Sequence, residues 1–322
     1  MHLVAMNLAQ GFARAVCFST SSLLVALATG CAPASTHPVV PAALGRAPSA
    51  YRLASVVDTP GPVVVETIDG ASWEVDRSGL INLDDPKAKA AGLVDGPEPV
   101  HLYAHAIKHP TRGTFLVDTG VERAYRDAPK KAAIQGLVAM VAHIDRLKVI
   151  TATGDWLVGK EPLTGVFLTH LHIDHVTGLP DVPRDVPVYV GPGEAQHPAL
   201  DHLFTADIVD RGMAGRTPFL ELRFAPDPDG AFEGVADLFG DGTVWALHTP
   251  GHTPGSTSFL ARTPSGPVLL VGDACHTRWG WDNGVEPGAF SSDIPRSRRS
   301  LDRLRAFAQK HPGMVVRLGH QP

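Results

Sequence analysis

Cysteine is scarce in this sequence, which has only three among its 322 residues. Loss of an N-terminal leader would remove Cys17, and modification of Cys31 would leave Cys275 as the only free thiol. The mature chain would then have no intrachain disulfide, which excludes a small fold held together by disulfides. At 322 residues the chain is long enough to bury a sizeable hydrophobic core instead.

Positive charge is also in short supply. The 28 lysines and arginines are outnumbered by 33 aspartates and glutamates, which gives a formal net charge of -5. The chain lacks the broad basic field with which nucleic-acid-binding proteins neutralise phosphates, so nucleic acid is not expected as a partner. A hydrophobic content of 44% with 19% charged residues is ordinary for a globular domain and excludes a chain that is disordered throughout.

Long hydrophobic runs are absent, apart from one short run near the N-terminus. Arg14 precedes "AVCFSTSSLLVALATG", which is too short and too rich in serine and threonine for a good membrane-spanning helix. This pattern predicts a signal peptide over residues 1–30, and "LATGC" resembles a bacterial lipoprotein box, although Ala28 stands where leucine is commonest. We therefore expect a periplasmic or outer-membrane-anchored lipoprotein that touches the membrane only through lipid on Cys31. Plain secretion and a retained or wrongly assigned start are the alternatives.

Residues 31–55 are rich in proline and alanine and show no apolar periodicity. Such a composition predicts an extended, poorly ordered tether. Residues 56–322 contain no internal repeat and no second linker, so we expect a single folded domain there.

From about residue 56 onward, strand-like runs alternate with Gly/Pro turns, for example "GVFLTH", "VPVYVG", "STSFLART" and "PVLLVGDA". Two segments have helical patterns. Residues 130–147 carry an apolar stripe at helical spacing, and residues 295–313 start with a proline and end at Pro-Gly. Strands and helices mixed at this density predict an α/β (α+β) fold in which helices cover the outer faces of sheets.

The segment "FLTHLHIDHVTGLP" places three histidines and an aspartate within six residues. Because alternate residues of an extended segment point the same way, His170 and His172 can bind one metal ion from the same face. Asp174 and His175 leave the strand just beyond and can face a second ion. A lone histidine usually packs in a core or on a surface, but this grouping at a strand end is typical of a metal site.

Further candidate ligands follow other predicted strands. His252 comes after "TVWAL", Asp273 ends "PVLLVGD", and His320 ends "MVVRLGH" close to the C-terminus. Each lies at an exit from a strand into a loop, where side chains from several strands can meet.

These motifs, together with "VDTG" around Asp118, resemble those of the metallo-β-lactamase superfamily over about residues 56–322. The resemblance implies a four-layer αβ/βα sandwich of two mixed β-sheets flanked by helices, with two metal ions at one edge. It implies seven ligands: His170, His172 and His252 for one ion, Asp174, His175 and His320 for the other, and Asp273 as a bridge. Asp118 would support the site without binding an ion.

A set of histidines and carboxylates suits two divalent metal ions. Zinc (Zn2+) is expected from its abundance, and iron, manganese and cobalt are also compatible. Two ions that share a water lower its pKa toward ~7 and present hydroxide at neutral pH. Asp174 could both bind an ion and accept the proton of the attacking water.

The second half of the chain, around "HTPGHTPGSTSFLARTPSGPVLLVGDACHT", is most similar to the N-acyl-homoserine lactonase group. That group usually has a tyrosine three residues after the bridging aspartate, where this sequence has His276. The imidazole of His276 could donate a proton to a departing alkoxide, or it could be a solvent-facing loop residue. Trp279, Trp281 and Phe290 on the same loop could form an apolar wall for the substrate, or could attach the loop to the core.

We therefore expect a dinuclear metal-dependent hydrolase that uses a metal-bridging hydroxide to cleave a small ester-like bond, with lactones as the first candidates. A β-lactamase-like amidase or a thioesterase on the same metal site is the alternative, although zinc β-lactamases lack a bridging carboxylate at the position of Asp273. A domain that only binds metal or a ligand is a third hypothesis, which the presence of every expected ligand disfavours. The sequence leaves the oligomeric state open.

Overall fold

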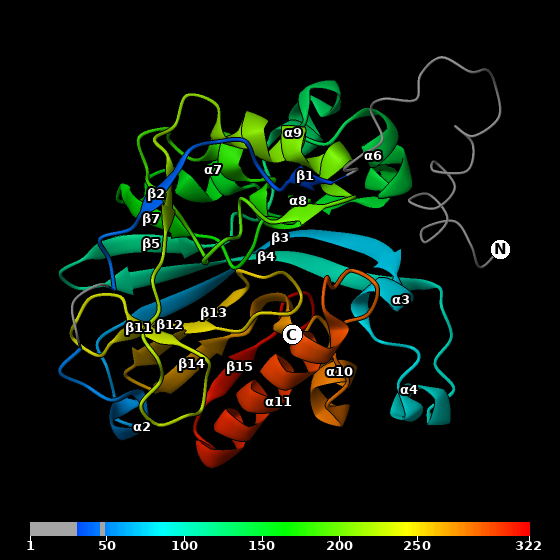
Figure 1. The fold of residues 1–322 in the computed structure, drawn as a ribbon. Coiled ribbons are helices and arrows are strands. Elements are labelled where there is room, and N and C mark those ends of the chain that lie inside the picture. Colours follow the sequence, from blue (N-terminus) through cyan, green and yellow to red (C-terminus); the bar gives the residue numbers. More distant parts are fainter. Residues whose placement is uncertain (1–30, 46–48) are drawn as a thin grey trace.

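The computed structural model describes residues 31–45 and 49–322, so the predicted signal peptide lies outside the described residues. Two large sheets pack face to face, and helices cover the outer face of each sheet (Figure 1). This arrangement confirms the predicted α/β (α+β) four-layer sandwich of two mixed β-sheets. Within the described ranges, no helix combines the length and the apolar character that crossing a membrane requires.

The larger sheet has eight strands in the order β2-β10-β8-β7-β5-β4-β3-β6. Their bounds are Val39–Pro41 (β2), Val64–Asp76 (β3), Pro97–His109 (β4), Gly113–Val117 (β5), Lys148–Val149 (β6), Leu163–Phe167 (β7), Val188–Val190 (β8) and Phe219–Glu221 (β10). Strands β5, β7, β8 and β10 run parallel. Because parallel strands end at the same edge of a sheet, the loops after β5, β7 and β8 open on one side of the molecule.

The smaller sheet has five strands in the order β11-β12-β13-β14-β15. Their bounds are Val235–Asp237 (β11), Val244–His248 (β12), Thr257–Thr263 (β13), Gly266–Leu270 (β14) and Val315–Arg317 (β15). Neighbours from β11 to β14 are antiparallel, whereas β15 pairs with β14 in parallel. The ends of β14 and β15 therefore lie at the same edge of the smaller sheet.

Helices lie on both outer faces of the sandwich (Figure 1). Those near the larger sheet are α5 (Ala124–Asp127), α6 (Gly136–Val141), α7 (Thr153–Leu157), α8 (Ile173–Val176) and α9 (His202–Met213). Those on the side of the smaller sheet and at the edge of the sandwich are α2 (Leu53–Val56), α3 (Arg77–Leu80), α4 (Pro86–Ala90), α10 (Arg278–Asn283) and α11 (Ile294–Lys310). The predicted C-terminal helix is confirmed as α11, which begins after Asp293, whose side chain accepts from the backbone N–H of Arg296.

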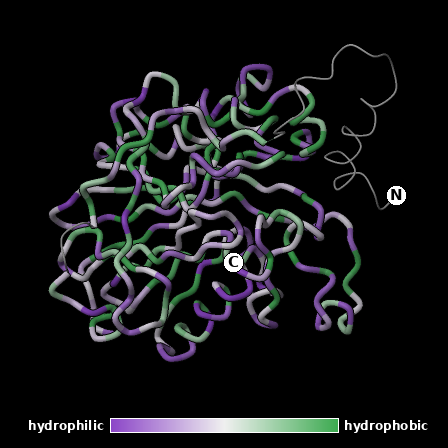
Figure 2. The backbone as a smooth tube through the Cα atoms, viewed as in Figure 1, coloured by the Kyte–Doolittle hydropathy of each residue, from purple (hydrophilic) through white to green (hydrophobic). Residues whose placement is uncertain are grey.

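Alternate residues of the central strands pack on opposite faces of their sheet, as the pleat of a strand requires. In β5, Phe115 and Val117 belong to the core between the sheets, whereas Leu116 packs with residues of the helices outside the larger sheet. In β13, Phe259 faces the core between the sheets and Leu260 packs in the cluster that includes α11. Neighbouring residues of these strands are therefore both hydrophobic, because each sheet is covered on both faces. Along the backbone as a whole, hydrophobic and hydrophilic stretches are interspersed (Figure 2).

The structure corrects the predicted tether over residues 31–55. Residues Ala32–Pro33 (β1) pair with Pro198–Ala199 (β9), and β2 pairs in parallel with β10 at the edge of the larger sheet. Leu53 in α2 is buried in the cluster beneath α11. An edge strand leaves backbone groups unpaired, and even a segment rich in proline can use them. The prediction of a poorly ordered tether is therefore wrong for these parts of the segment.

The predicted helix over residues 130–147 is also wrong as one continuous element. It is divided into three short pieces: η1 (Pro129–Lys131), α6 (Gly136–Val141) and η2 (Ile144–Arg146). Gly136 has a φ of 61° and His143 a φ of 51°, and residues with left-handed backbone interrupt a right-handed helix. The apolar periodicity did not reveal these two interruptions.

Candidate metal centre

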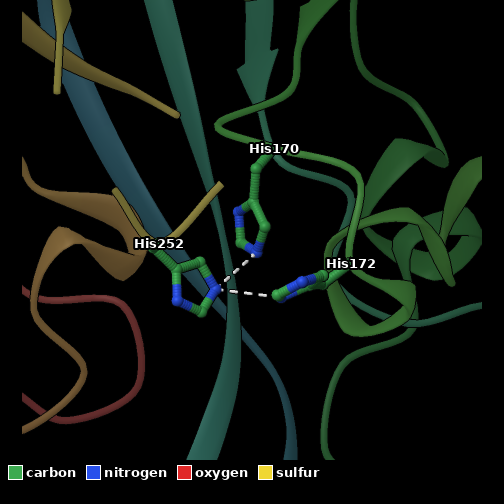
Figure 3. Close-up of side chains that lie close together, drawn as sticks. All are labelled: His170, His172 and His252. Carbon is green, nitrogen blue, oxygen red and sulfur yellow. Dashed lines mark hydrogen bonds between the residues drawn. The ribbon is translucent and has the colours of Figure 1, made fainter. Parts of the chain in front are cut away.

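The first group of candidate ligands lies where β7 leaves the larger sheet. His170 and His172 follow β7, and His172 has extended backbone (φ −65°, ψ 151°) immediately before α8. His252 comes from the loop after β12, in the smaller sheet. The three imidazoles point toward one another (Figure 3). His252 Nε2 lies 3.1 Å from His170 Nε2 and 2.9 Å from His172 Nδ1.

The second group comprises Asp174, His175, Asp273 and His320. Asp174 and His175 lie in α8, Asp273 lies in the 3₁₀ helix η4 (Gly272–Ala274) after β14, and His320 follows β15. Asp174 Oδ2 lies 3.5 Å from His175 Nε2 and 3.3 Å from His320 Nε2. Asp273 Oδ2 lies 3.2 Å from each of the same two nitrogens. The structure thus gathers all seven predicted ligands into two adjoining groups.

Asp273 stands between the two groups. Its Oδ2 is also 3.5 Å from His252 Nε2 and 3.7 Å from His170 Nε2. The residue is 4% exposed, and among the described residues its Oδ1 has no hydrogen-bond partner. Burial of a carboxylate without enough donors is unfavourable, and cations beside it offset that penalty. Ligand atoms about 2.1 Å from an ion lie roughly 3.0–3.4 Å apart. The residues therefore fit two divalent metal ions.

The ring nitrogens that point away from the centre are held by the surrounding protein. His175 Nδ1 donates to Asp118 Oδ2 at 2.9 Å, and His320 Nδ1 donates to the carbonyl oxygen of His101 at 2.8 Å. Such hydrogen bonds direct the Nε2 atoms at the centre. Asp118 has a left-handed φ of 57° at the end of β5 and also accepts from the backbone N–H of Thr169 at 2.8 Å. Asp118 thus lies behind a ligand candidate, as expected of a supporting residue.

Glu194 joins the two ligand loops, and sequence reasoning missed it. It follows β8, is 2% exposed, and accepts from the backbone N–H of Leu171 at 2.8 Å. Its other oxygen accepts from Gly255 N at 2.9 Å and Thr253 Oγ1 at 2.7 Å. Leu171 lies between the two histidines of the first motif, and Thr253 directly follows the third histidine. A single glutamate in the turn "GPGEAQ" carries no sequence signal for this role.

The histidines of the centre differ in their electrostatics. Burial and the neighbouring imidazoles hold the pKa values of His170 and His252 well below the usual range, so both rings are neutral and present lone pairs. Burial also acts on His320, but the carboxylates of Asp273 and Asp174 raise its pKa to about 10. A divalent ion competes with the proton on such a ring, so metal binding is expected to release it.

The structure decides between the alternative roles predicted for His276 and for the aromatic residues of the loop after Asp273. His276 is 1% exposed, with Nε2 3.0 Å from Asp273 Oδ2, so the solvent-facing hypothesis is wrong. Trp281 packs in the cluster beneath α11. Trp279 packs in the cluster that contains Trp73 of β3 and Val100 of β4, whereas Phe290 is 44% exposed. The two tryptophans therefore attach the loop to the core.

Comparisons with known proteins agree with this geometry. A family model described as the metallo-beta-lactamase superfamily matches residues 98–320. The chain is 35% identical over 162 residues to N-acyl homoserine lactonase AttM of Agrobacterium fabrum, a match that covers 49% of this chain and 57% of that protein. It is 26% identical over 244 residues to gamma-lactamase FDB1 of Fusarium pseudograminearum, covering 69% of this chain and 57% of that protein. The chain thus spans little more than half the length of these relatives.

A solved structure shares the fold. It is an N-acyl homoserine lactone hydrolase with the product N-hexanoyl-L-homoserine bound at the catalytic metal centre. It superposes with a TM-score of 0.56 at 20% identity, covering 82% of this chain and 94% of that chain.

Proposed function

We propose, from the premise that the chain belongs to the metallo-beta-lactamase superfamily, that it is a dinuclear metal-dependent hydrolase acting on a lactone. The observation that carries the proposal is the position of Asp273, whose Oδ2 lies within 3.7 Å of imidazoles from both ligand groups. A structural zinc site surrounds a single ion with four protein ligands, whereas two ions that share a carboxylate keep positions open for water and substrate.

The relatives support a lactone as the chemical class of the substrate. AttM is named as an N-acyl homoserine lactonase, and the similar solved structure holds N-hexanoyl-L-homoserine at its catalytic metal centre. Because the match spans 57% of AttM, we extend to this chain the class of the substrate and not its acyl group.

The residues of the centre can carry out the proton transfers of lactone hydrolysis. Two divalent ions held by these residues would supply an activated water and polarise the substrate carbonyl. Asp174 has 17% of its side chain exposed, against 3% for Asp273, so the carboxylate of Asp174 is the one better placed to meet substrate. We assign to that carboxylate the proton of the attacking water. Water adds to the carbonyl carbon, the ring C–O bond breaks, and the proton passes to the leaving alkoxide to give a hydroxy acid.

The test is a substrate panel run on one preparation of the purified chain, containing lactones, thioesters, phosphodiesters and nitrocefin. Lactone turnover is expected to exceed nitrocefin turnover, and Asp273→Ala is expected to abolish it. Unchanged turnover in Asp273→Ala would reveal a contaminant or another site. Faster hydrolysis of nitrocefin than of every lactone would contradict the substrate class.

A cyclic amide is the second candidate substrate, because gamma-lactamase FDB1 matches a larger share of this chain than AttM does, 69% against 49%. The same centre would then act as an amidase, and a thioester is a further possibility for the same attacking water. A γ-lactam added to the panel decides between the classes, since its turnover above that of every lactone would replace the first proposal with the second.

We propose zinc as the metal in both positions. Imidazole and carboxylate donors without cysteine suit Zn2+, and they also accept iron, manganese and cobalt. Elemental analysis of the purified chain is expected to give two zinc ions per chain. Two ions of another metal would overturn the choice of zinc and leave the hydrolase proposal intact.

We further propose that the chain is exported and held at a membrane by lipid on Cys31. Support comes from Cys31 itself, which is exposed and lies immediately before β1, so a lipid there leaves the core undisturbed. Fractionation of cells is expected to find the chain with membranes and Cys31→Ser in the soluble periplasmic fraction. Retention of Cys31→Ser with membranes would contradict the anchor.

A further inference from the structure

His276 is an eighth metal-capable side chain inside the centre, beyond the seven predicted ligands. It lies three residues after Asp273 and is 1% exposed. Its Nε2 is 3.0 Å from Asp273 Oδ2, the shortest approach of any imidazole to that oxygen. Its ring also lies 5.0 Å from the ring of His252, centroid to centroid. One potential ligand atom from each of His252, Asp273 and His276 lies within 4.8 Å of the other two.

The opposite side of the ring fixes its tautomer. His276 Nδ1 lies 3.0 Å from the carbonyl oxygen of Leu80, at the end of α3. A carbonyl oxygen can only accept, so Nδ1 carries the proton and donates it. If Nε2 carries no proton, it presents a lone pair to the carboxylate oxygen of Asp273. Two lone pairs facing at this distance repel unless a proton or a metal ion lies between them, and a 3.0 Å separation is the edge expected for two ligands of one ion.

This arrangement repeats that of His320 and His175. In each, Nδ1 donates to a fixed acceptor in the protein, and Nε2 faces Asp273 Oδ2, at 3.2 Å for both of those residues. Histidines that bind metals almost always donate their second N–H to a carboxylate or a carbonyl oxygen. The ring of His276 is thus held by the same kind of Nδ1 hydrogen bond as two of the predicted ligands.

We propose that His276 Nε2 is a metal ligand, shared with Asp273 and directed to the ion bound by His170, His172 and His252. This inference rests on the proposed dinuclear centre and replaces the hypothesis that His276 protonates the leaving group. A ring whose Nε2 binds an ion while its Nδ1–H is bound to Leu80 has no proton left to give to a leaving group. The added ligand reduces the open positions on this ion and leaves the ion near Asp174 as the one more open to substrate.

The test measures metal binding directly. Full-length wild type, His276→Ala and His276→Gln are titrated with Zn2+ against a competing chelator, and the Co2+-substituted forms are examined by visible absorption. One of the two ions is expected to bind at least about tenfold more weakly in both variants. The absorption of Co2+ at that position is expected to change because its ligand set changes. Two ions held with wild-type affinity and an unchanged Co2+ spectrum in a folded variant would overturn the proposal, even with activity lost.

His109→Gln is the matched control. His109 is also a buried histidine facing a carboxylate, with Nε2 3.1 Å from Asp241 Oδ2. Its Nδ1 accepts from the backbone N–H groups of Thr111 and Arg112, so Nε2 carries the proton and makes an ordinary hydrogen bond. Metal affinity is expected to stay unchanged in this variant.

Two further measurements distinguish an error in the dinuclear centre from an error in the role of His276. If wild type and His109→Gln both bind fewer than two ions after loading, the dinuclear centre itself is wrong. If both His276 variants fail to fold, Co2+-loaded wild type decides by NMR. A ligating His276 gives a strongly shifted, slowly exchanging Nδ1–H signal in addition to those of His175 and His320, and its absence contradicts the proposal.

Discussion

Glu194 and Asp273 are both buried carboxylates, and their neighbours give them different roles. Asp273 Oδ2 faces imidazole nitrogens, whereas Glu194 accepts from two backbone N–H groups and a hydroxyl of the ligand loops. A carboxylate surrounded by N–H and O–H donors organises the backbone, while one surrounded by imidazoles favours cations. Glu194 is therefore a positioning residue for the centre.

Replacing Glu194 by glutamine is expected to weaken metal binding. The amide NH₂ would face groups that are themselves donors, so the loops carrying His170 and His252 would shift apart. We expect roughly 10–100-fold lower affinity for one ion, measured by chelator competition. Glu221→Gln is the control, because Glu221 accepts from Gly193 N at an exposed position. Equal affinities in the two variants would contradict the positioning role.

Glu122 predicts a pH-dependent change in stability. It is 4% exposed and accepts from the backbone N–H of Ala133, and burial raises its pKa from 4.5 to about 7, with Asp181 adding to the rise. Because the folded state holds this proton more tightly than the unfolded state, Glu122 lowers stability progressively as pH rises from about 4.5 to about 7. Glu122→Gln removes this titration.

We therefore expect Glu122→Gln to be more stable than wild type at pH 8, by about 2–3 kcal/mol, and nearly equal to it below pH 5. Urea unfolding at both pH values measures the difference. A stability difference that stays constant with pH would show that ionisation of Glu122 is not its cause.

At the scale of elements, the directions of the strands bring the ligands together. In the larger sheet, β5, β7 and β8 are parallel, so Asp118, His170 and Glu194 leave it at one edge. In the smaller sheet, β14 and β15 are parallel, so Asp273 and His320 also leave together. Sheet topology therefore converts distant positions in the sequence into neighbours.

Helix α11 stabilises the smaller sheet from outside. Leu304 is fully buried in the cluster that α11 forms with β12, β13 and β14. We expect Leu304→Ala to lower the free energy of unfolding by about 2–5 kcal/mol, because it removes buried methyl groups and leaves a cavity. The exposed Arg299→Ala, on the same helix, is expected to change it by less than about 0.5 kcal/mol. Similar losses in the two variants would mean that α11 is not packed as described.

At the scale of the whole molecule, the centre connects the two sheets. His170 and His172 follow a strand of the larger sheet, and His252, Asp273 and His320 follow strands of the smaller sheet. Bound ions would therefore hold the two halves of the sandwich together and stabilise the folded state, since a preformed site does not exist in the unfolded chain.

Removal of metal is expected to lower the melting temperature. An ion present at 100 times its Kd contributes about 2.7 kcal/mol to stability. Thermal unfolding with a chelator, and again after zinc is restored, measures the effect, which should be reversible. Asp273→Ala is expected to respond much less to the chelator. A wild-type melting temperature that is indifferent to the chelator would exclude a link between the sheets through metal.

Much of the centre could be predicted from short stretches of sequence. The spacing of His170, His172 and Asp174 at the end of a strand indicates metal ligands, because side-chain direction alternates along a strand. The helix α11 was predicted for a similar reason, from apolar spacing and a proline at its start. The edge pairing of β2 and the helix breaks at Gly136 and His143 were not predictable, since they depend on backbone conformations that composition and periodicity do not encode.

The sequence by itself determined which side chains are available to bind metal and which segments form the strands that carry them. Only the tertiary structure decided how those side chains are oriented. The tautomer of His276 depends on the carbonyl oxygen of Leu80, 196 residues away in the chain, and the loops of the centre depend on Glu194. Periodicity and spacing act over a few neighbouring residues, whereas a hydrogen bond between remote segments exists only once the sheets have packed.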